Sequence, residues 1–311
     1  MRYCRGGSSR ARSLRGFTLF EVSIVLVIVG LIIGGVLVGQ DIIRSSEMRG
    51  TISQIQRYQA AVRAFEEKYD NQLPGDLNAK TATRYGFTAR GTYPGMGDGN
   101  GIIEGVNGAG ATFNWGTVQM TGETLMFWVD LTSANGLKIN LIDGSFSTAS
   151  PTTLSFVNKT GTTIDLYLPQ AKMGRGNYVY VWSGGVGGAV HGVSDGINYY
   201  AISAVYNLDH LGILDSTPGM TVRQAYDIDK KIDDGLPQTG NVTAQYLQGI
   251  IALTGPVWAA GGGVAGTSDT TATAGSSTTC YDNSGVAGIQ RYSITQSNGS
   301  GLNCALSFQF Q

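Results

Sequence analysis

The feature that most constrains the fold is a long uncharged segment close to the N-terminus. Nineteen consecutive residues, 22–40, carry no charge and directly follow Glu21. At 1.5 Å per residue a helix of this length reaches roughly 28 Å, close to the ~30 Å hydrocarbon core of a bilayer. The segment therefore predicts a membrane-spanning helix. Glu21 is unusual beside it, because an unpaired carboxylate at mid-bilayer costs at least about 2.5 kcal/mol and calls for a partner.

The sixteen residues before this segment form a basic leader. Residues 1–16 contain five arginines and no acidic residue, which predicts that this end stays in the cytoplasm. An ordinary secretory signal places its apolar region before the cleavage site, whereas here the apolar run follows the Gly16-Phe17 pair. Cleavage between Gly16 and Phe17 would leave the hydrophobic helix on the mature protein. It would also create an amine on Phe17, one helical turn from Glu21.

These features, in this order, resemble the prepilin-type processing signal of type IV pilins and type II secretion pseudopilins. The residues that carry the resemblance are Arg15-Gly16-Phe17-Thr18-Leu19-Phe20-Glu21-Val22. The resemblance implies that prepilin peptidase cuts after Gly16 and that the new N-terminus, Phe17, is methylated. It also implies that Glu21 pairs with the amine of a neighbouring subunit during assembly on an inner-membrane platform. The alternative is a simple signal anchor that contains a glutamate by chance.

The helix is expected to continue beyond the membrane. Apolar residues recur at steps of three and four after Asp41, which predicts one helix from about Phe17 to Tyr69, about 80 Å long. Leu73-Pro74-Gly75 follows closely and favours termination. We therefore expect a leader at 1–16, a transmembrane or filament-core half at 17–40, an amphipathic half at 41–70 and a head at 71–311. The apolar positions are Met48, Ile52, Ile55, Tyr58, Val62, Phe65 and Tyr69.

The head is expected to be rich in glycine and β-structure. Glycine accounts for 46 of 311 residues and charged residues for only 14%, which favours turns and sheets over long soluble helices. One short helix is predicted to be capped by Thr121 and to end just before Gly136, and another to span Met220–Ile232. An antiparallel sheet against the second half of the stem gives a pilin-like α+β fold. The predicted strands are 162–168, 177–182, 197–206, 288–294 and 304–310.

The cysteines suggest an oxidising compartment. Cys4 lies in the leader, so its removal would leave Cys280 and Cys304 as a pair. We expect an exported domain to join them in a disulfide bond, which stabilises the fold by roughly 3 to 4 kcal/mol in the chain-entropy model. Two free buried thiols are the alternative.

Two acidic segments are candidate cation sites. Asp98, Asn100 and Glu104 offer oxygen atoms on a glycine-rich loop, as calcium requires, although the full EF-hand pattern is absent. A polar surface turn is the alternative. The second candidate is the acidic cluster of Asp227, Asp229, Asp233 and Asp234. Its last two members lie at the predicted C-terminus of the 220–232 helix, where the macrodipole disfavours negative charge. Lys230 and Lys231 are near enough to offset it, so a solvated charged face is favoured over a metal site there.

Catalysis has little support in the sequence. A serine hydrolase built around Ser183 or Ser194 is the open alternative, although no nucleophile-elbow spacing supports it. The chain has two histidines and lacks Cys-His, HExxH and P-loop arrangements. Its net charge of −1 gives no electrostatic footprint for nucleic acid. We therefore expect a non-enzymatic subunit of a pilus or secretion pseudopilus, inserted in the bacterial inner membrane and then assembled into a periplasmic or cell-surface filament. No cofactor is required, and calcium is the one candidate ion. The alternative is a membrane-tethered extracytoplasmic binding or enzymatic domain that uses the helix only as an anchor.

Overall fold

The computed structural model shows an α+β chain. It divides into two compact units, Met1–Ser45 and Ser46–Gln311. The described residues of the first unit, 17–45, form the N-terminal part of one long helix, and the strands of the described residues lie in the second unit. The residues described are 17–91, 95–106, 114–115, 122–134, 137–146, 159–184, 196–208, 214–249, 256–259, 263–264, 279–282 and 290–310.

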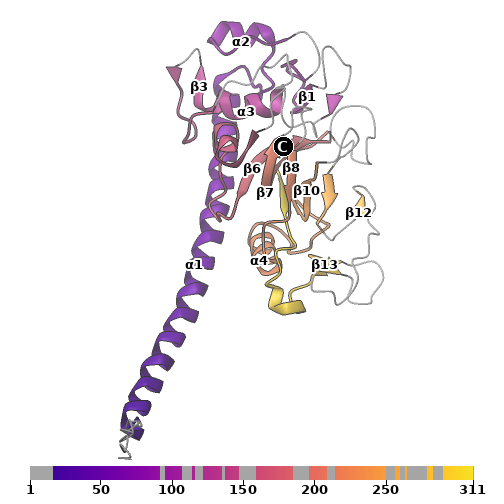
Figure 1. Ribbon diagram of the computed structural model, residues 1–311. Helices are drawn as coiled ribbons and strands as arrows, with labels where there is room; N and C mark the ends of the chain where they lie inside the picture. Colours follow the sequence, from indigo (N-terminus) through magenta and orange to yellow (C-terminus); the bar gives the residue numbers. More distant parts are fainter. Residues whose placement is uncertain are drawn as a thin grey trace, which may run out of the picture. The chain divides into compact units, whose positions relative to one another are not determined.

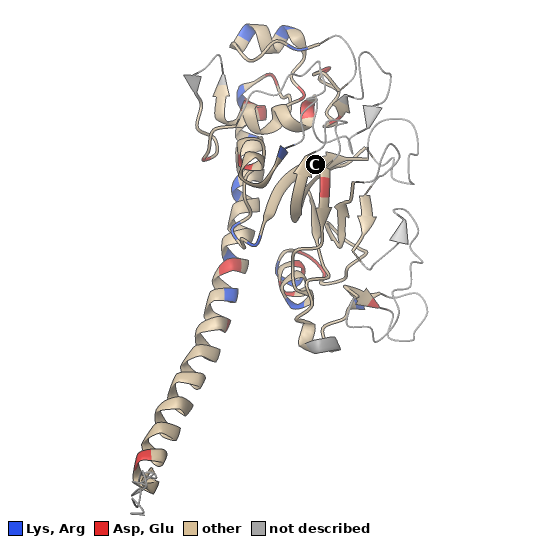
Figure 2. Cartoon of the chain, viewed as in Figure 1, with Lys and Arg blue, Asp and Glu red and all other residues tan. Residues whose placement is uncertain are grey.

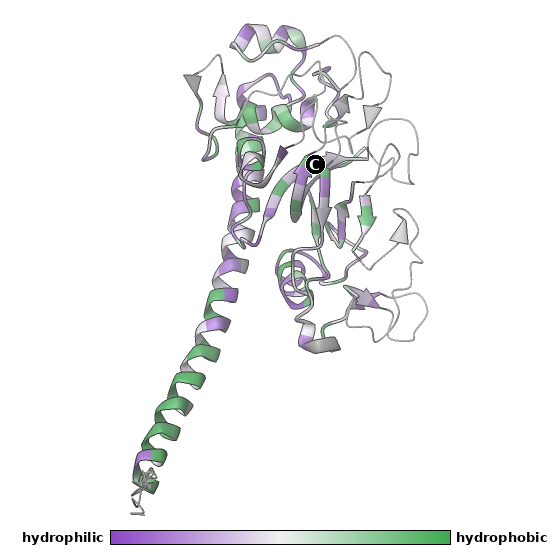
Figure 3. Cartoon of the chain, viewed as in Figure 1, coloured by the Kyte–Doolittle hydropathy of each residue, from purple (hydrophilic) through white to green (hydrophobic). Residues whose placement is uncertain are grey.

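The long helix α1 spans Leu19–Lys68 and confirms the predicted stem to within two residues at each end (Figure 1). In the first unit its side chains are exposed. Charged residues are scarce along this part (Figure 2), and apolar residues cover it (Figure 3). Among the helices of the described residues, α1 alone is long and apolar enough to be a candidate membrane span.

The part of α1 in the second unit is buried along one stripe. Ile55, Val62 and Phe65 are at most 3% exposed. The ring of Tyr58 lies 5.1 Å from that of Trp128 in helix α3 (Glu123–Thr132) and 6.1 Å from that of Tyr200 in strand β7 (Asn198–Leu208), centroid to centroid. The second half of the stem therefore packs on the head domain, as its three-and-four spacing predicts.

The head is organised around a six-stranded antiparallel sheet with β7 at its centre (Figure 1). β6 (Asn177–Ser183) pairs with β7 over its whole length, with Tyr180 opposite Ala201. On the other edge of β7, β15 (Leu306–Gln309) pairs in register Phe308 to Tyr200, and β9 (Val242–Thr243) pairs with β15. The short strands β5 (Lys159–Thr160) and β8 (Leu214–Thr217) pair with the end of β7.

Every residue of β6 is buried, so both faces of the sheet are covered. On one face, Tyr200 contacts the aromatic rings of α1 and α3. On the other, the Tyr180 hydroxyl accepts a hydrogen bond from the backbone N–H of Leu247 at 3.0 Å. Leu247 belongs to β10 (Gln245–Leu247), which pairs with β11 (Pro256–Trp258) and β12 (Gly263–Val264).

The remaining short elements surround this core. β1 (Gly105–Val106) pairs with β2 (Asn114–Trp115), β3 (Ser133–Ala134) with β4 (Leu137–Lys138), and β13 (Tyr281–Asp282) with β14 (Arg291–Tyr292). Helix α2 spans Ala79–Tyr85, and the 3₁₀-helices η1 and η2 span Gly161–Leu166 and Gln296–Gly299.

The two predicted head helices are present with different caps. Helix α4 (Val222–Ile232) begins at the N-cap Thr221, whose side chain accepts from the N–H of Gln224 while the Gln224 side chain accepts in return. This capping box places the start of α4 two residues after the predicted Met220, while the predicted end at Ile232 is confirmed. Helix α3 has Gly122 at its N-cap and ends at Thr132. Thr121, the predicted cap, lies outside the described residues.

Two of the predicted strands are corrected. Residues 162–168 are mainly 3₁₀-helical, because Ile164 and Leu168 are buried while Leu166 is 50% exposed. Burial at a spacing of four selects a helical turn over the alternating pattern of a strand. Within 288–294, strand pairing is confined in the described residues to Arg291–Tyr292. The strands predicted at 177–182, 197–206 and 304–310 are confirmed, the last over Leu306–Gln309.

Candidate functional site

The first candidate site is the N-terminal end of α1. The backbone N–H and the hydroxyl of Thr18 both donate to Oε2 of Glu21, at 2.8 Å each, and the N–H of Glu21 donates to the Thr18 hydroxyl at 3.2 Å. This reciprocal arrangement is a capping box, in which the carboxylate also complements the positive end of the helix dipole. Glu21 therefore stabilises its own helix. The Thr-x-x-Glu spacing of this capping box is visible in the sequence. Gly16 lies outside the described residues.

Glu21 has no basic neighbour on its own helix. The next basic residue along the chain is Arg44, which at 1.5 Å per residue lies roughly 34 Å further along α1. The large apolar side chains between Phe17 and Ile43 are between 43% and 88% exposed. This end of the helix thus combines a lone carboxylate with an apolar surface whose exposure to water is unfavourable.

The second candidate site is a group of three carboxylates in the head, Asp76, Asp98 and Glu123, which we call the carboxylate cluster. One oxygen of each lies within 4.8 Å of the others. Asp76 follows the Leu73-Pro74-Gly75 turn, Asp98 lies in the glycine-rich loop, and Glu123 is the first residue of α3. Asp76 and Glu123 are fully buried, whereas Asp98 is exposed.

Glycines allow these three segments to meet. Gly75 has φ +86°, and a Cβ there would lie 2.3 Å from the backbone oxygen of Glu123. Gly97 has φ +93°, and a Cβ there would lie 2.3 Å from the backbone oxygen of Leu77. Both positions combine a left-handed backbone with a close backbone approach, so only glycine fits without strain.

Backbone N–H groups hold the two buried carboxylates. Gly99 and Gly101 each donate to one oxygen of Asp76 at 2.7 Å. The N–H groups of Gly97 and Glu104 donate to the two oxygens of Glu123 at 2.9 and 2.7 Å. Among the described residues, no lysine or arginine forms an ion pair with either carboxylate.

The electrostatics follow from burial. Loss of solvation raises the pKa of Asp76 to about 7, although its two N–H donors oppose the rise. Burial, and next the charge of Asp76, raise the pKa of Glu123 well above its ordinary value. A buried carboxylate without a cation favours its neutral form. The cluster therefore has a strong tendency to hold a proton, or to bind a hard cation through its oxygen atoms.

The structure changes the ligand set predicted from the glycine-rich loop. The side-chain oxygen of Asn100 accepts from the N–H of Ile102 at 2.7 Å, and its amide nitrogen donates to Asp98 at 3.2 Å and to Glu104 at 3.5 Å. Asp98 is brought together with Asp76 and Glu123 instead. Calcium binding at this loop stays a prediction, with the carboxylate cluster as the better set of ligands.

A second acidic group surrounds the end of α4. Oxygens of Asp229, Asp233 and Asp234 also lie within 4.8 Å of one another. The N–H of Val242 donates to Asp233 at 3.0 Å, and the hydroxyl of Thr239 donates to Asp234 at 2.6 Å. Loop donors thus offset the unfavourable dipole, a role that the sequence had suggested for Lys230 and Lys231.

The disulfide predicted between Cys280 and Cys304 is present, with Cα atoms 5.0 Å apart. Both cysteines are fully buried. Cys304 also forms backbone hydrogen bonds in both directions with Met220, just before α4. The bond therefore fixes the segment around β13 to the start of β15.

Comparison of the chain with protein-family models, with curated proteins and with solved structures finds no match.

Proposed function

We propose that this chain is a structural subunit of a type IV pilus or of a type II secretion-like pseudopilus. In this proposal prepilin peptidase cleaves after Gly16, Phe17 is methylated, and the mature chain assembles through α1. The observation that carries the proposal is the exposed apolar part of α1 with Glu21 at its start. Such a surface is stable in lipid or against other helices of the same kind, but not in water.

In this proposal Glu21 has one partner in the single chain and gains a second on assembly. In the single chain, the hydrogen bonds from Thr18 reach only Oε2 of the carboxylate. The amine that cleavage creates on Phe17 of an adjacent subunit would pair with Oε1, so the cap on the helix survives assembly. A charge pair in an apolar environment is strong when both groups are hydrogen-bonded, and it fixes the register between neighbours.

The proposal also assigns a location to each part of the chain. The basic leader stays in the cytoplasm, α1 spans the inner membrane, and the head faces outward, where an oxidising compartment favours the Cys280–Cys304 bond. After assembly the head lies on a periplasmic or cell-surface filament. Major pilin, minor pilin and secretion pseudopilin are all consistent with these features.

A pair of substitutions separates the capping role of Glu21 from the assembly role. Glu21→Gln retains a side chain that suits the capping box but removes the charge. Thr18→Ala removes the cap but retains the charge, at a cost of about 1 kcal/mol to the helix. We expect Glu21→Gln to insert in the membrane and to lose most sheared filament, and Thr18→Ala to retain most of it. Wild-type filament yield from Glu21→Gln would refute the charge pairing.

Cleavage is tested separately. Gly16→Val should leave the precursor uncut, visible as a larger band on a denaturing gel, and mature-sized protein would contradict the proposed junction. A membrane-tethered domain that uses the helix only as an anchor is the second candidate. It predicts strictly monomeric membrane protein and no filament that contains this chain.

A further inference from the structure

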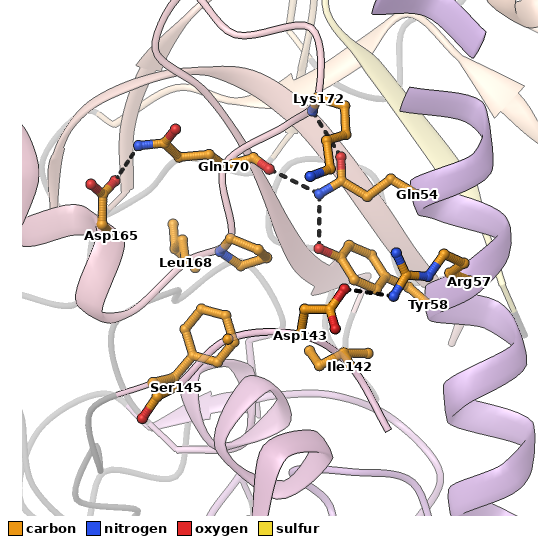
Figure 4. Close-up of a pocket in the computed structure, with 13 residues that line it drawn as sticks. Gln54, Arg57, Tyr58, Ile142, Asp143, Ser145, Asp165, Leu168, Gln170 and Lys172 are labelled. Atoms are coloured by element: carbon orange, nitrogen blue, oxygen red, sulfur yellow. Dashed lines mark hydrogen bonds and ion pairs between the residues drawn. The ribbon is translucent and has the colours of Figure 1, made fainter. Parts of the chain in front are cut away.

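A cavity of about 310 Å³ lies in the second unit between α1 and the segments 142–146 and 165–172 (Figure 4). Small-ligand sites have volumes of roughly 300 Å³ upward, so this cavity suits a ligand of one or two rings. Tyr58, Ile142 and Leu168 contribute apolar surface, and each is at most 7% exposed. Four charged side chains also line it.

A buried amide holds the walls of this cavity in place. Gln54 donates from Nε2 to the Tyr58 hydroxyl and to the backbone oxygen of Gln170, both at 2.8 Å, and its Oε1 accepts from the N–H of Lys172 at 2.9 Å. These bonds join α1 to the 170–172 segment (Figure 4). Side chains fixed in this way lose little further entropy when a ligand binds.

The charged lining is balanced, and several of its polar groups face solvent. Arg57 and Asp143 form an ion pair at 2.7 Å, with side chains 59% and 88% exposed. Asp165 accepts through one oxygen, from Gln170 at 2.8 Å and from the Tyr178 hydroxyl at 2.6 Å. The second oxygen of Asp165, the Lys172 ammonium and the hydroxyl hydrogen of Tyr58 have no partner among the described residues.

This combination restricts the class of ligand. Two basic and two acidic side chains give no net charge, which disfavours a simple anion or cation. An apolar ligand would leave the charged groups unsatisfied as it excludes water from them. A hydroxyl group both donates and accepts, so a ligand with several hydroxyls matches free donors and free acceptors together. The apolar residues of the cavity match the C–H face of a sugar ring.

We propose that this cavity binds a neutral saccharide of one or two rings, with the Arg57–Asp143 pair contacting adjacent hydroxyls. The site would give the head a recognition role that is independent of how α1 assembles. It does not require filament formation, so it is tested on the single chain.

The test uses the full chain in a zwitterionic detergent without a sugar headgroup. Saturation-transfer NMR would measure binding of glucose, galactose, mannose, N-acetylglucosamine and their disaccharides, with glutamate and putrescine as charged probes. We expect at least one saccharide to bind with a millimolar Kd and neither charged probe to bind. Failure of every saccharide, or preferential binding of a charged probe, would overturn the proposal.

Two variants locate the binding. Asp143→Ala, at a highly exposed position, should weaken saccharide affinity at least tenfold, and Arg57→Gln should do the same. The control is Asp227→Ala, because Asp227 forms an ion pair with the exposed Arg223 on α4, and neither residue lines the cavity. Near-UV circular dichroism checks that each variant is folded. Equal affinity of the wild type and both cavity variants would refute the assignment.

Discussion

The carboxylate cluster predicts that the head loses stability as the pH rises. The pKa of Asp76 is raised from 3.8 to about 7 in the folded chain. Between these values the folded state holds a proton that the unfolded state releases. Stability falls with rising pH wherever the folded state binds more protons. The contribution is therefore fully present below about pH 4 and is lost as the pH rises towards about 7.

The size of the effect follows from the same values. At 1.36 kcal/mol per pH unit, Asp76 alone accounts for roughly 3 kcal/mol of stability lost between pH 5 and pH 8. A change of 1 kcal/mol shifts the Tm of a domain of this size by about 2 to 4 °C, so we expect a decrease of roughly 6 to 12 °C. Glu123 adds to the decrease, because its pKa is also raised by burial.

The assay is thermal unfolding of the full chain in detergent with EGTA, followed by tryptophan fluorescence. Trp128 and Trp182 are fully buried and report on the core around the sheet. The matched variant Asp76→Asn keeps a similar shape but does not titrate, so its Tm should fall less between pH 5 and pH 8, by the share that Asp76 contributes. Burial also raises the pKa of Asp229 to about 7, so the share of the decrease that comes from Asp229 remains in the variant. Parallel pH curves for Asp76→Asn and the wild type would refute the reasoning, as would a wild-type Tm that rises with pH.

Two further predictions concern the same domain. Replacing Cys280 and Cys304 by serine opens a loop with a sequence separation of 24. The free energy of unfolding should fall by roughly 3 to 4 kcal/mol, seen as a lower Tm under non-reducing conditions. An unchanged Tm would contradict this prediction. Millimolar calcium at pH 8 should raise the Tm of the wild type but not of Asp98→Asn, because oxygen ligands and an ionised cluster favour this ion. A flat calcium titration would argue against the site.

Local patterns explain most of the correct predictions. The stem was predictable because its apolar residues repeat at helical spacing. Helix α4 was predictable because Ala225, Ile228 and Ile232 share one helical face, with Gly235 just beyond its end. Strands β6 and β7 were predictable from β-branched and aromatic residues that alternate or cluster between turns. The 3₁₀-helix η1 was missed because its β-branched residues favour a strand locally. Burial of Ile164 and Leu168 against the rest of the head overrode that preference.

The candidate sites differ in how far the sequence alone could identify them. The lone carboxylate Glu21, its basic leader and its apolar helix lie within one continuous stretch, so the sequence by itself determined that candidate site. The carboxylate cluster joins Asp76, Asp98 and Glu123 from three separate segments, and the cavity joins α1 to two distant loops. Their residues have no common spacing along the chain. Only the packing of glycine turns against α3, and of the loops against α1, brought them together.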